Sequence, residues 1–296
     1  MRNPDGADLP EVEAGSHLQF PVQLPDGETV IRHYSICSNP ARRDVYEIAV
    51  LREDAGGGGS AAVHDQFSIG RQLHSELPQN HFRIHDDARP ALLIAGGIGI
   101  TPIKAMAQSL KARGRDFHLH YAGRSGQEMA FRDRLLREFG DNMAVYKSDE
   151  AGRLDIKQLM SAASDDSIFY VCGPGGLIDA VVETAAELGI DPARIRFERF
   201  IATVAADARP IQVELRRSGK QIAVAADQTI LDAMLEAGVE SPYSCKAGNC
   251  KSCAVKVLDG EPDHRDSALS SAEREDYRLI CPCVSRAKGD RLSLDI

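Results

Sequence analysis

The sequence has no excess of positive charge, no membrane-length apolar run and no apolar leader core. Its 296 residues carry 35 Lys and Arg against 44 Asp and Glu, a net charge of −9 that argues against a nucleic-acid partner. Glycines interrupt the longest apolar run, residues 91–100, so we expect no membrane association. The first residues, Met-Arg-Asn-Pro-Asp-Gly, predict no secretion. We therefore expect a soluble cytoplasmic protein.

Hydrolytic chemistry finds no support either, because neither a Ser-His-Asp pattern nor a carboxylate pair stands out. The chain is long enough for two or three domains. Its seven cysteines, in a chain without an export signal, indicate reduced thiols and metal ligands rather than disulfides.

Five of these cysteines lie near the C-terminus. Cys245, Cys250 and Cys253 are separated by four and then two residues, the spacing of a plant-type [2Fe–2S] ferredoxin loop. Cys281 and Cys283 follow Cys253 after 27 and 29 residues, and both are candidates for the fourth ligand. A zinc site is the alternative, but structural zinc is usually held by two short Cys or His pairs. A triplet with a distant single cysteine favours iron–sulfur.

The chain before this loop divides into two segments with different patterns of apolar and polar residues. Residues 1–88 contain short alternating stretches at 17–22, 30–36 and 45–51, which predict a small antiparallel barrel. Within them, the glycine run 56–60 is expected to be a flexible hairpin loop or a phosphate nest. Residues 89–201 alternate between apolar strands and helices, which predicts a doubly wound parallel sheet.

The third segment, residues 210–296, is predicted to start with a hairpin and then a helix over 229–238 that ends at Gly238. The cysteine loop follows this helix directly. Residues 202–209 are rich in alanine and lack periodicity, so we expect them to form a linker.

Two glycine turns end strands of the parallel sheet. Gly96 and Gly97 precede Thr101, where a buried strand turns into a helix, and glycines there let the backbone approach a pyrophosphate. The second turn is Cys172-Gly173-Pro174. Because both turns lie at the carboxyl edge of the sheet, we predict a dinucleotide crevice. Cys172 is either a buried strand-end residue or a thiol beside a nicotinamide ring.

The barrel segment carries a triplet of polar residues on one strand. Alternation places Arg32 and Tyr34 on one face and Ser35 on the other. Arginine pairs with phosphate, tyrosine covers an aromatic ring and serine bonds a flavin edge. An ordinary half-exposed strand is the alternative for such a triplet.

In this order of segments, the chain resembles the phthalate dioxygenase reductase family, which includes the vanillate O-demethylase reductases. These proteins supply electrons to Rieske-type oxygenases. The resemblance covers nearly the whole chain, and its motifs lie at residues 13–17, 32–35, 48–50, 58–60, 95–102, 172–174, 197–200, 245–253, 260–266 and 283–287.

The resemblance implies FMN, NADH and a [2Fe–2S] cluster as cofactors. The matching residues implied to bind FMN are Arg32, Tyr34, Ser35, Ala49, Val50, Gly59 and Ser60. Those implied to lie near NADH are Gly96, Gly97, Cys172, Gly173 and Pro174. Thr101 and Phe200 are placed near the flavin, and Ser35, Thr101 and Cys172 are the catalytic candidates. The family's fourth ligand precedes a Val-Ser-Arg-Ala stretch, which selects Cys283 over Cys281.

Two departures from the family accompany this resemblance. The family has a strand before the point where this chain starts, so the barrel is expected to lack its first strand. Lys251 stands where the family has glycine, at a cost on the order of 1 kcal/mol if the position needs positive φ.

The resemblance implies an NADH-dependent reductase that passes electrons through FMN and the cluster to a Rieske-type oxygenase. The alternative is a [2Fe–2S] electron carrier whose truncated barrel holds no flavin.

Overall fold

The computed structural model describes residues 1–54, 58–150, 152–200 and 208–296. The chain divides into two compact units, Met1–Phe197 and Glu198–Ile296, and each unit has hydrophobic cores of its own. The expected linker over 202–209 falls almost entirely outside the described residues, as do residues 56 and 57 of the glycine run.

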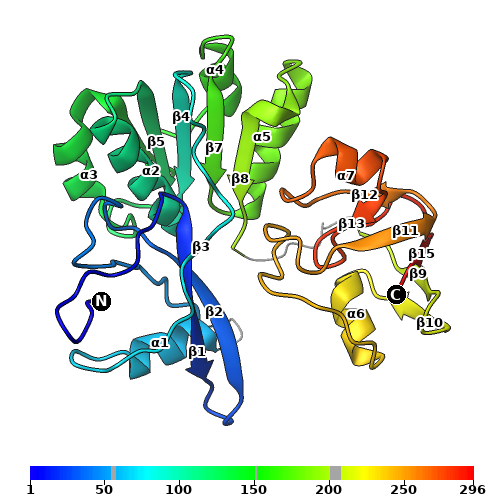
Figure 1. The fold of residues 1–296 in the computed structure, drawn as a ribbon. Helices are drawn as coiled ribbons and strands as arrows, with labels where there is room; N and C mark the ends of the chain where they lie inside the picture. Colours follow the sequence, from blue (N-terminus) through cyan, green and yellow to red (C-terminus); the bar gives the residue numbers. More distant parts are fainter. Residues whose placement is uncertain (55–57, 151, 201–207) are drawn as a thin grey trace. The chain divides into compact units, whose positions relative to one another are not determined.

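The first unit begins with a three-stranded antiparallel sheet in the order β2-β1-β3 (Figure 1). Leu18, Phe20 and Val22 alternate along β1 and are buried in the barrel core, as the period of two in the sequence predicts. Burying each such side chain stabilises the fold by about 1.5–3 kcal/mol. The elements of this part are β1 (Ser16–Gln23), β2 (Thr29–Ser35), α1 (Gly59–Gln66) and β3 (Gln79–Asn80).

Two expectations for this part are corrected. Residues 45–51 form no strand, because their backbone bonds are divided between two separate segments: Tyr46 exchanges two bonds with Met1, and Cys37 N–H donates to Glu47 O. The described end of the glycine run is not a hairpin loop, since α1 begins at Gly59.

The second part of this unit is a five-stranded sheet in the order β6-β5-β4-β7-β8, with parallel pairing of β4 to β5 and β7 and of β5 to β6. Leu93 and Tyr170 pack on the face covered by α2 and α3, and Ile94 and Phe169 on the face covered by α4 and α5 (Figure 1). This confirms the doubly wound sheet. Its elements are β4 (Ala91–Gly96), η1 (Gly97–Gly99), α2 (Ile100–Ala112), β5 (Phe117–Gly123), α3 (Arg132–Phe139), η2 (Gly140–Asn142), β6 (Met143–Lys147), α4 (Ile156–Ser161), β7 (Ile168–Cys172), α5 (Gly175–Glu187), η3 (Pro192–Arg194) and β8 (Ile195–Glu198).

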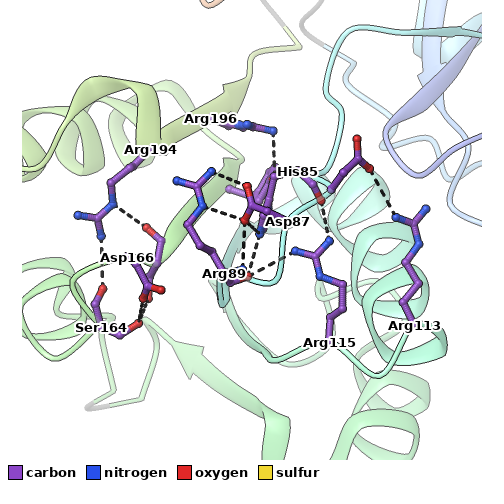
Figure 2. A network of polar contacts seen from close by, with 12 residues as sticks. His85, Asp87, Arg89, Arg113, Arg115, Ser164, Asp166, Arg194 and Arg196 are labelled. Carbon is purple, nitrogen blue, oxygen red and sulfur yellow. Dashed lines mark hydrogen bonds and ion pairs between the residues drawn. The ribbon is translucent and has the colours of Figure 1, made fainter.

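A polar network fixes the segment that enters this sheet from the barrel (Figure 2). The buried His85 lies 2.8 Å from the Tyr170 hydroxyl through Nδ1 and 2.8 Å from Arg89 O through Nε2. Arg115 donates to His85 O at 2.6 Å, and Arg196 to the Tyr170 hydroxyl at 3.2 Å. Arg196 also donates to Arg83 O at 3.1 Å, so the connecting segment is bonded to β7 through His85 and to β8 through Arg83.

The second unit is a mixed sheet in the order β10-β9-β15-β11-β13, in which β9 and β15 are parallel and the other neighbouring strands are antiparallel. The predicted hairpin and helix are confirmed as β9, β10 and α6, and the Thr229 side chain caps α6. The elements are β9 (Ile211–Leu215), β10 (Lys220–Val224), α6 (Ile230–Glu236), β11 (Val255–Asp259), β12 (Pro262–Asp263), α7 (Ser271–Glu275), β13 (Leu279–Ile280), β14 (Arg286–Ala287) and β15 (Arg291–Leu294). Among the described residues, no helix has the length and apolarity needed to cross a bilayer.

Candidate functional site

The two glycine turns meet at the carboxyl edge of the parallel sheet. β4 and β7 are neighbours at the point where the strand order reverses, which is where ligands bind in such sheets. A Cβ on Gly99 would lie 2.2 Å from Cys172 O, and one on Gly173 would lie 2.9 Å from the Gly96 Cα. A Cβ on Gly96 would lie 2.7 Å from Pro174 Cδ. The turns therefore pack backbone to backbone, and Gly97, with φ of 53°, needs the conformation that glycine allows.

Thr101 and Cys172 are both buried beside these turns. The Thr101 hydroxyl donates to Ile98 O at 3.0 Å, which fixes the side chain in the first turn of α2. Cys172 ends β7 and is fully buried, and its carbonyl is the group that approaches Gly99.

Arg32 converges with the start of α1. A Cβ on Gly59 would lie 2.2 Å from Arg32 Nε, so the arginine side chain crosses directly over the first helical residue. Gly58 has a positive φ of 74°, and no side chain among the described residues caps the helix. Uncapped N–H groups at a helix N-terminus favour an anion, and the guanidinium adds positive charge. Ser60, the second residue of α1, lies at the same point.

The strand register places the rest of the triplet as alternation predicts. Tyr34 pairs with Leu18 and Arg32 with Phe20, so both belong to the core-facing set, while Ser35 pairs with His17 on the opposite face. Burial raises the pKa of Tyr34, with Arg32 opposing the shift, so the hydroxyl remains a donor. Ala49 and Val50 are half-buried, and Val50 O lies 2.9 Å from His64 Nε2.

Three histidine rings gather on the Ser35 face of this sheet. The His17 ring centroid lies 5.2 Å from that of His33 and 5.5 Å from that of His81. His17 is 6% exposed, and neither of its ring nitrogens has a partner among the described residues. Burial, with the two neighbouring imidazoles, lowers the pKa of His17 to about 4.

Because the folded protein holds His17 neutral while the unfolded chain protonates it below its ordinary pKa of 6.5, acid favours unfolding. We expect the His17 contribution to be intact above this pKa and to fall by about 2 kcal/mol by about pH 5. The His17→Gln variant should lose this part of the pH dependence in urea unfolding, and His74→Gln, at an exposed position, is the control. Parallel wild-type and H17Q curves would contradict the assignment.

The cysteine loop is folded around its own sulfurs. The backbone N–H groups of Ala247 and Asn249 each lie 3.4 Å from Cys245 Sγ, and Cys245 N–H lies 3.5 Å from Cys250 Sγ. N–H groups aimed at thiolates are the environment that an iron–sulfur cluster needs. The donor set of closely spaced thiols thus fits a [2Fe–2S] cluster.

The two candidates for the fourth ligand are both buried beside Cys253. Cys253 Sγ lies 3.3 Å from Cys283 Sγ. The bond to Cys253 raises the pKa of Cys283, with burial and the Cys245 sulfur adding to the rise and the Gly248 N–H opposing it. The pKa of Cys281 is raised by Cys253, by burial and by the Asp266 carboxylate. Cys253 therefore acts on both thiols; Cys283 in addition lies near Cys245 and Gly248 of the loop, whereas Cys281 lies near Asp266.

Two lysines of the loop adopt left-handed backbone conformations. Lys251 has φ of 62°, so the position where the family has glycine does need positive φ, and Lys246 has φ of 50°. Both ammonium groups are ion-paired, Lys251 to Glu273 at 2.6 Å and Lys246 to Asp232 at 2.9 Å. These pairs offset much of the positive charge that the loop presents.

The comparisons with known proteins agree with this geometry. The protein-family model described as "2Fe-2S iron-sulfur cluster binding domain" matches residues 213–288. The family model described as "Dimethylamine monooxygenase subunit DmmA-like, N-terminal domain" matches residues 71–195. The vanillate O-demethylase oxidoreductase of Pseudomonas sp. (strain HR199 / DSM 7063) is 40% identical over 99% of this chain and 92% of its own length. The chain belongs to the phthalate dioxygenase reductase family.

Other similar proteins support this family assignment. The heme-dependent oxidative N-demethylase beta subunit of Ectopseudomonas mendocina (strain ymp) is 41% identical over 97% of this chain and 90% of its own length. The solved structure of phthalate dioxygenase reductase, described as modular for electron transfer from pyridine nucleotides to [2Fe–2S], is 36% identical with a TM-score of 0.68, over all of this chain and 91% of that one. A type IV self-sufficient cytochrome P450 monooxygenase is 39% identical with a TM-score of 0.73; this chain spans only 38% of it.

This chain is accordingly an oxidoreductase of this family, and the predicted fold class and the [2Fe–2S] cluster domain are confirmed. The zinc alternative is set aside by the cluster-domain match. The roles of individual residues stay predictions. Phe200 is 42% exposed and belongs to the second unit, so its expected place beside the flavin also stays a prediction.

Two residues that bear on the site were not predicted from the sequence. Lys104, in α2, is fully buried and forms an ion pair with Glu47 of the barrel at 2.9 Å. The sequence signal that could have indicated a buried lysine is its position inside an otherwise apolar stretch, Ile103-Lys104-Ala105-Met106.

Proposed function

We propose that this reductase takes electrons from NADH, carries them through FMN and the [2Fe–2S] cluster, and delivers them to a Rieske-type oxygenase component. When bound, the flavin accepts two electrons as hydride and releases them singly, and the cluster carries them onward. The main support is that the two glycine turns at the strand-order reversal, the Arg32–Gly59 convergence and the sulfur-directed cysteine loop are all formed in one chain.

In this proposal, different residues of the barrel bind the phosphate, the ring and the polar edge of the flavin. Arg32, the N-terminus of α1 with Gly59, and Ser60 hold the FMN phosphate. Tyr34 covers the ring, the Ser35 hydroxyl bonds its polar edge, and the backbone at Ala49 and Val50 lines it.

The parallel sheet binds the nucleotide. Gly96, Gly97, Gly173 and Pro174 leave room for the dinucleotide backbone, and the N-terminus of α2 favours its negative charge. Thr101 and Cys172 are proposed to contact the nicotinamide and flavin rings and exclude water. In the second unit, Cys245, Cys250, Cys253 and Cys283 are the proposed cluster ligands.

An anaerobic NADH titration of the purified protein tests this function. We expect one FMN per chain in the extract and bleaching of both the flavin and the iron–sulfur absorbance, with NADPH as the comparison donor. An iron–sulfur spectrum without flavin, unchanged by NADH, would instead identify a simple electron carrier.

A haem-containing oxygenase is the second candidate partner, because one relative at 41% identity is named a heme-dependent demethylase subunit. Anaerobic mixing of the NADH-reduced protein with a purified Rieske component or a purified haem component separates the two. We expect fast reoxidation by the Rieske component. Fast reoxidation by the haem component alone would assign the other partner class.

A further inference from the structure

Lys104 places a positive charge in the interior of the first unit. It is 0% exposed, and its Nζ lies 2.9 Å from Glu47 Oε2 and 4.9 Å from the centroid of the Phe131 ring. The same ammonium donates a hydrogen bond to Cys37 O. A buried ammonium is costly unless its charge and donors are satisfied, and here the partners come from three different segments. The position therefore depends on all three segments being in place.

Both barrel partners adjoin residues assigned to the flavin. Cys37 follows Ser35 by two residues, and Glu47 precedes Ala49 by two. These two segments are also bonded to each other, since Cys37 N–H donates to Glu47 O at 2.8 Å and Cys37 Sγ lies 3.3 Å from the same oxygen. Burial raises the pKa of Cys37 to about 12, so its thiol keeps the proton that it donates. Lys104 thus binds two barrel segments, at Cys37 and Glu47, that are already hydrogen-bonded to each other.

On the other side, Lys104 belongs to the helix that begins at the nucleotide turn. It lies three residues after Thr101 in α2, and residues at this spacing are neighbours on one helix face. The contact of Gly99 with Cys172 O fixes the start of the same helix against β7. The ammonium therefore connects the flavin segments of the barrel to the turn assigned to the nicotinamide.

We propose that Lys104 is a positioning residue for hydride transfer, whose buried ammonium sets the distance between the flavin-binding segments and the nicotinamide-binding turn. The inference rests on the proposed function. The transfer moves one proton with two electrons from the dihydronicotinamide to the flavin, and Lys104 exchanges neither. Because misplacement of reacting groups by about 1 Å costs roughly 10²-fold in rate, loss of this contact should slow the transfer.

The test is anaerobic stopped-flow reduction of the flavin by NADH in the holoprotein. Lys104→Met keeps an unbranched apolar side chain one atom shorter than lysine and removes the charge. We expect its limiting rate of flavin reduction to fall about tenfold or more, while the half-saturating NADH concentration changes less than about threefold. The matched control is Lys111→Met, an exposed lysine of the same helix that bonds Glu138 O, and it should keep both values.

A second variant covers the case in which Lys104→Met loses FMN or folds poorly. Glu47 is a third exposed and also pairs with Arg134 at 3.4 Å, so Glu47→Gln removes the anion from the Lys104 pair and from the exposed Arg134 pair, while its amide oxygen can still accept from Lys104. Its limiting rate should fall by about threefold, with FMN retained. A wild-type rate in E47Q, or in a flavin-loaded K104M, would overturn the proposal. A wild-type protein that binds no flavin or does not react with NADH would refute the proposed function instead.

Discussion

The Cys283→Ser variant is expected to lose its iron–sulfur cluster, whereas Cys281→Ser keeps it. Cys283 faces the loop, since the Cys245 sulfur and the Gly248 N–H both act on its thiol, and its Sγ lies 3.3 Å from that of Cys253. A hydroxyl is a poor substitute for a thiolate ligand of iron. The iron content should fall from about two atoms per chain to a small fraction of that, together with the EPR signal of the reduced protein.

The flavin-dependent activity of the C283S variant is a control for correct folding of the first unit. NADH reduction of ferricyanide through the flavin alone should persist in C283S, which would show that only the cluster is lost. C281S should retain iron and the EPR signal. Its buried hydroxyl should reduce the free energy of unfolding by about 1–3 kcal/mol. Full iron in C283S with loss in C281S would reverse the ligand assignment.

The fourth ligand shows where sequence spacing stops being informative. The triplet alone leaves Cys281 and Cys283 open as the fourth ligand. The resemblance selects Cys283, and the plant-type gap of 29 residues agrees with it. In three dimensions Cys253 acts on both thiols, and the difference between them is that Cys245 and Gly248 of the loop also act on Cys283, whereas the Asp266 carboxylate acts on Cys281. Spacing records chain length between thiols but not which way each one faces.

The fold could be predicted best where one pattern decides the outcome. The parallel strands are short apolar runs buried on both faces, so β4 and β7 were located from composition. Residues 45–51 carry the same alternation as a strand, but a strand needs one continuous partner, and the backbone bonds there are divided between Met1 and Cys37. The α1 helix was missed because its start is hidden in a glycine run.

Lys104 was missed for a different reason. Its partners Cys37 and Glu47 lie 67 and 57 residues away in the chain, and a local sequence pattern cannot predict a buried ion pair between residues so far apart. By contrast, Lys251 was identified in advance, because a single position with positive φ is a local property that a glycine in the family marks.

The Gly99→Ala variant is expected to bind NADH about tenfold more weakly while it retains FMN. A Cβ at this position would lie 2.2 Å from Cys172 O and 2.6 Å from Gly173 N, and both atoms belong to the backbone. Gly99 has φ of −60°, so the penalty comes from the clash and not from a conformation reserved for glycine. Separating the two turns should cost about 1–3 kcal/mol in stability and raise the half-saturating NADH concentration about tenfold.

Two further glycines turn this prediction into a graded series. A Cβ on Gly96 would meet side-chain atoms of Leu177 and Pro174 at 2.7 Å, and side chains yield more readily than backbone, so Gly96→Ala should have a smaller effect. Gly176, in α5, has nothing within 4 Å, and Gly176→Ala should leave NADH binding unchanged and stabilise the helix by about 0.5–1 kcal/mol. Titrations with NADH and thermal unfolding of the three variants measure both effects. Equal NADH affinity in G99A and G176A would contradict the crevice, because the backbone contact between the turns would then be irrelevant to nucleotide binding.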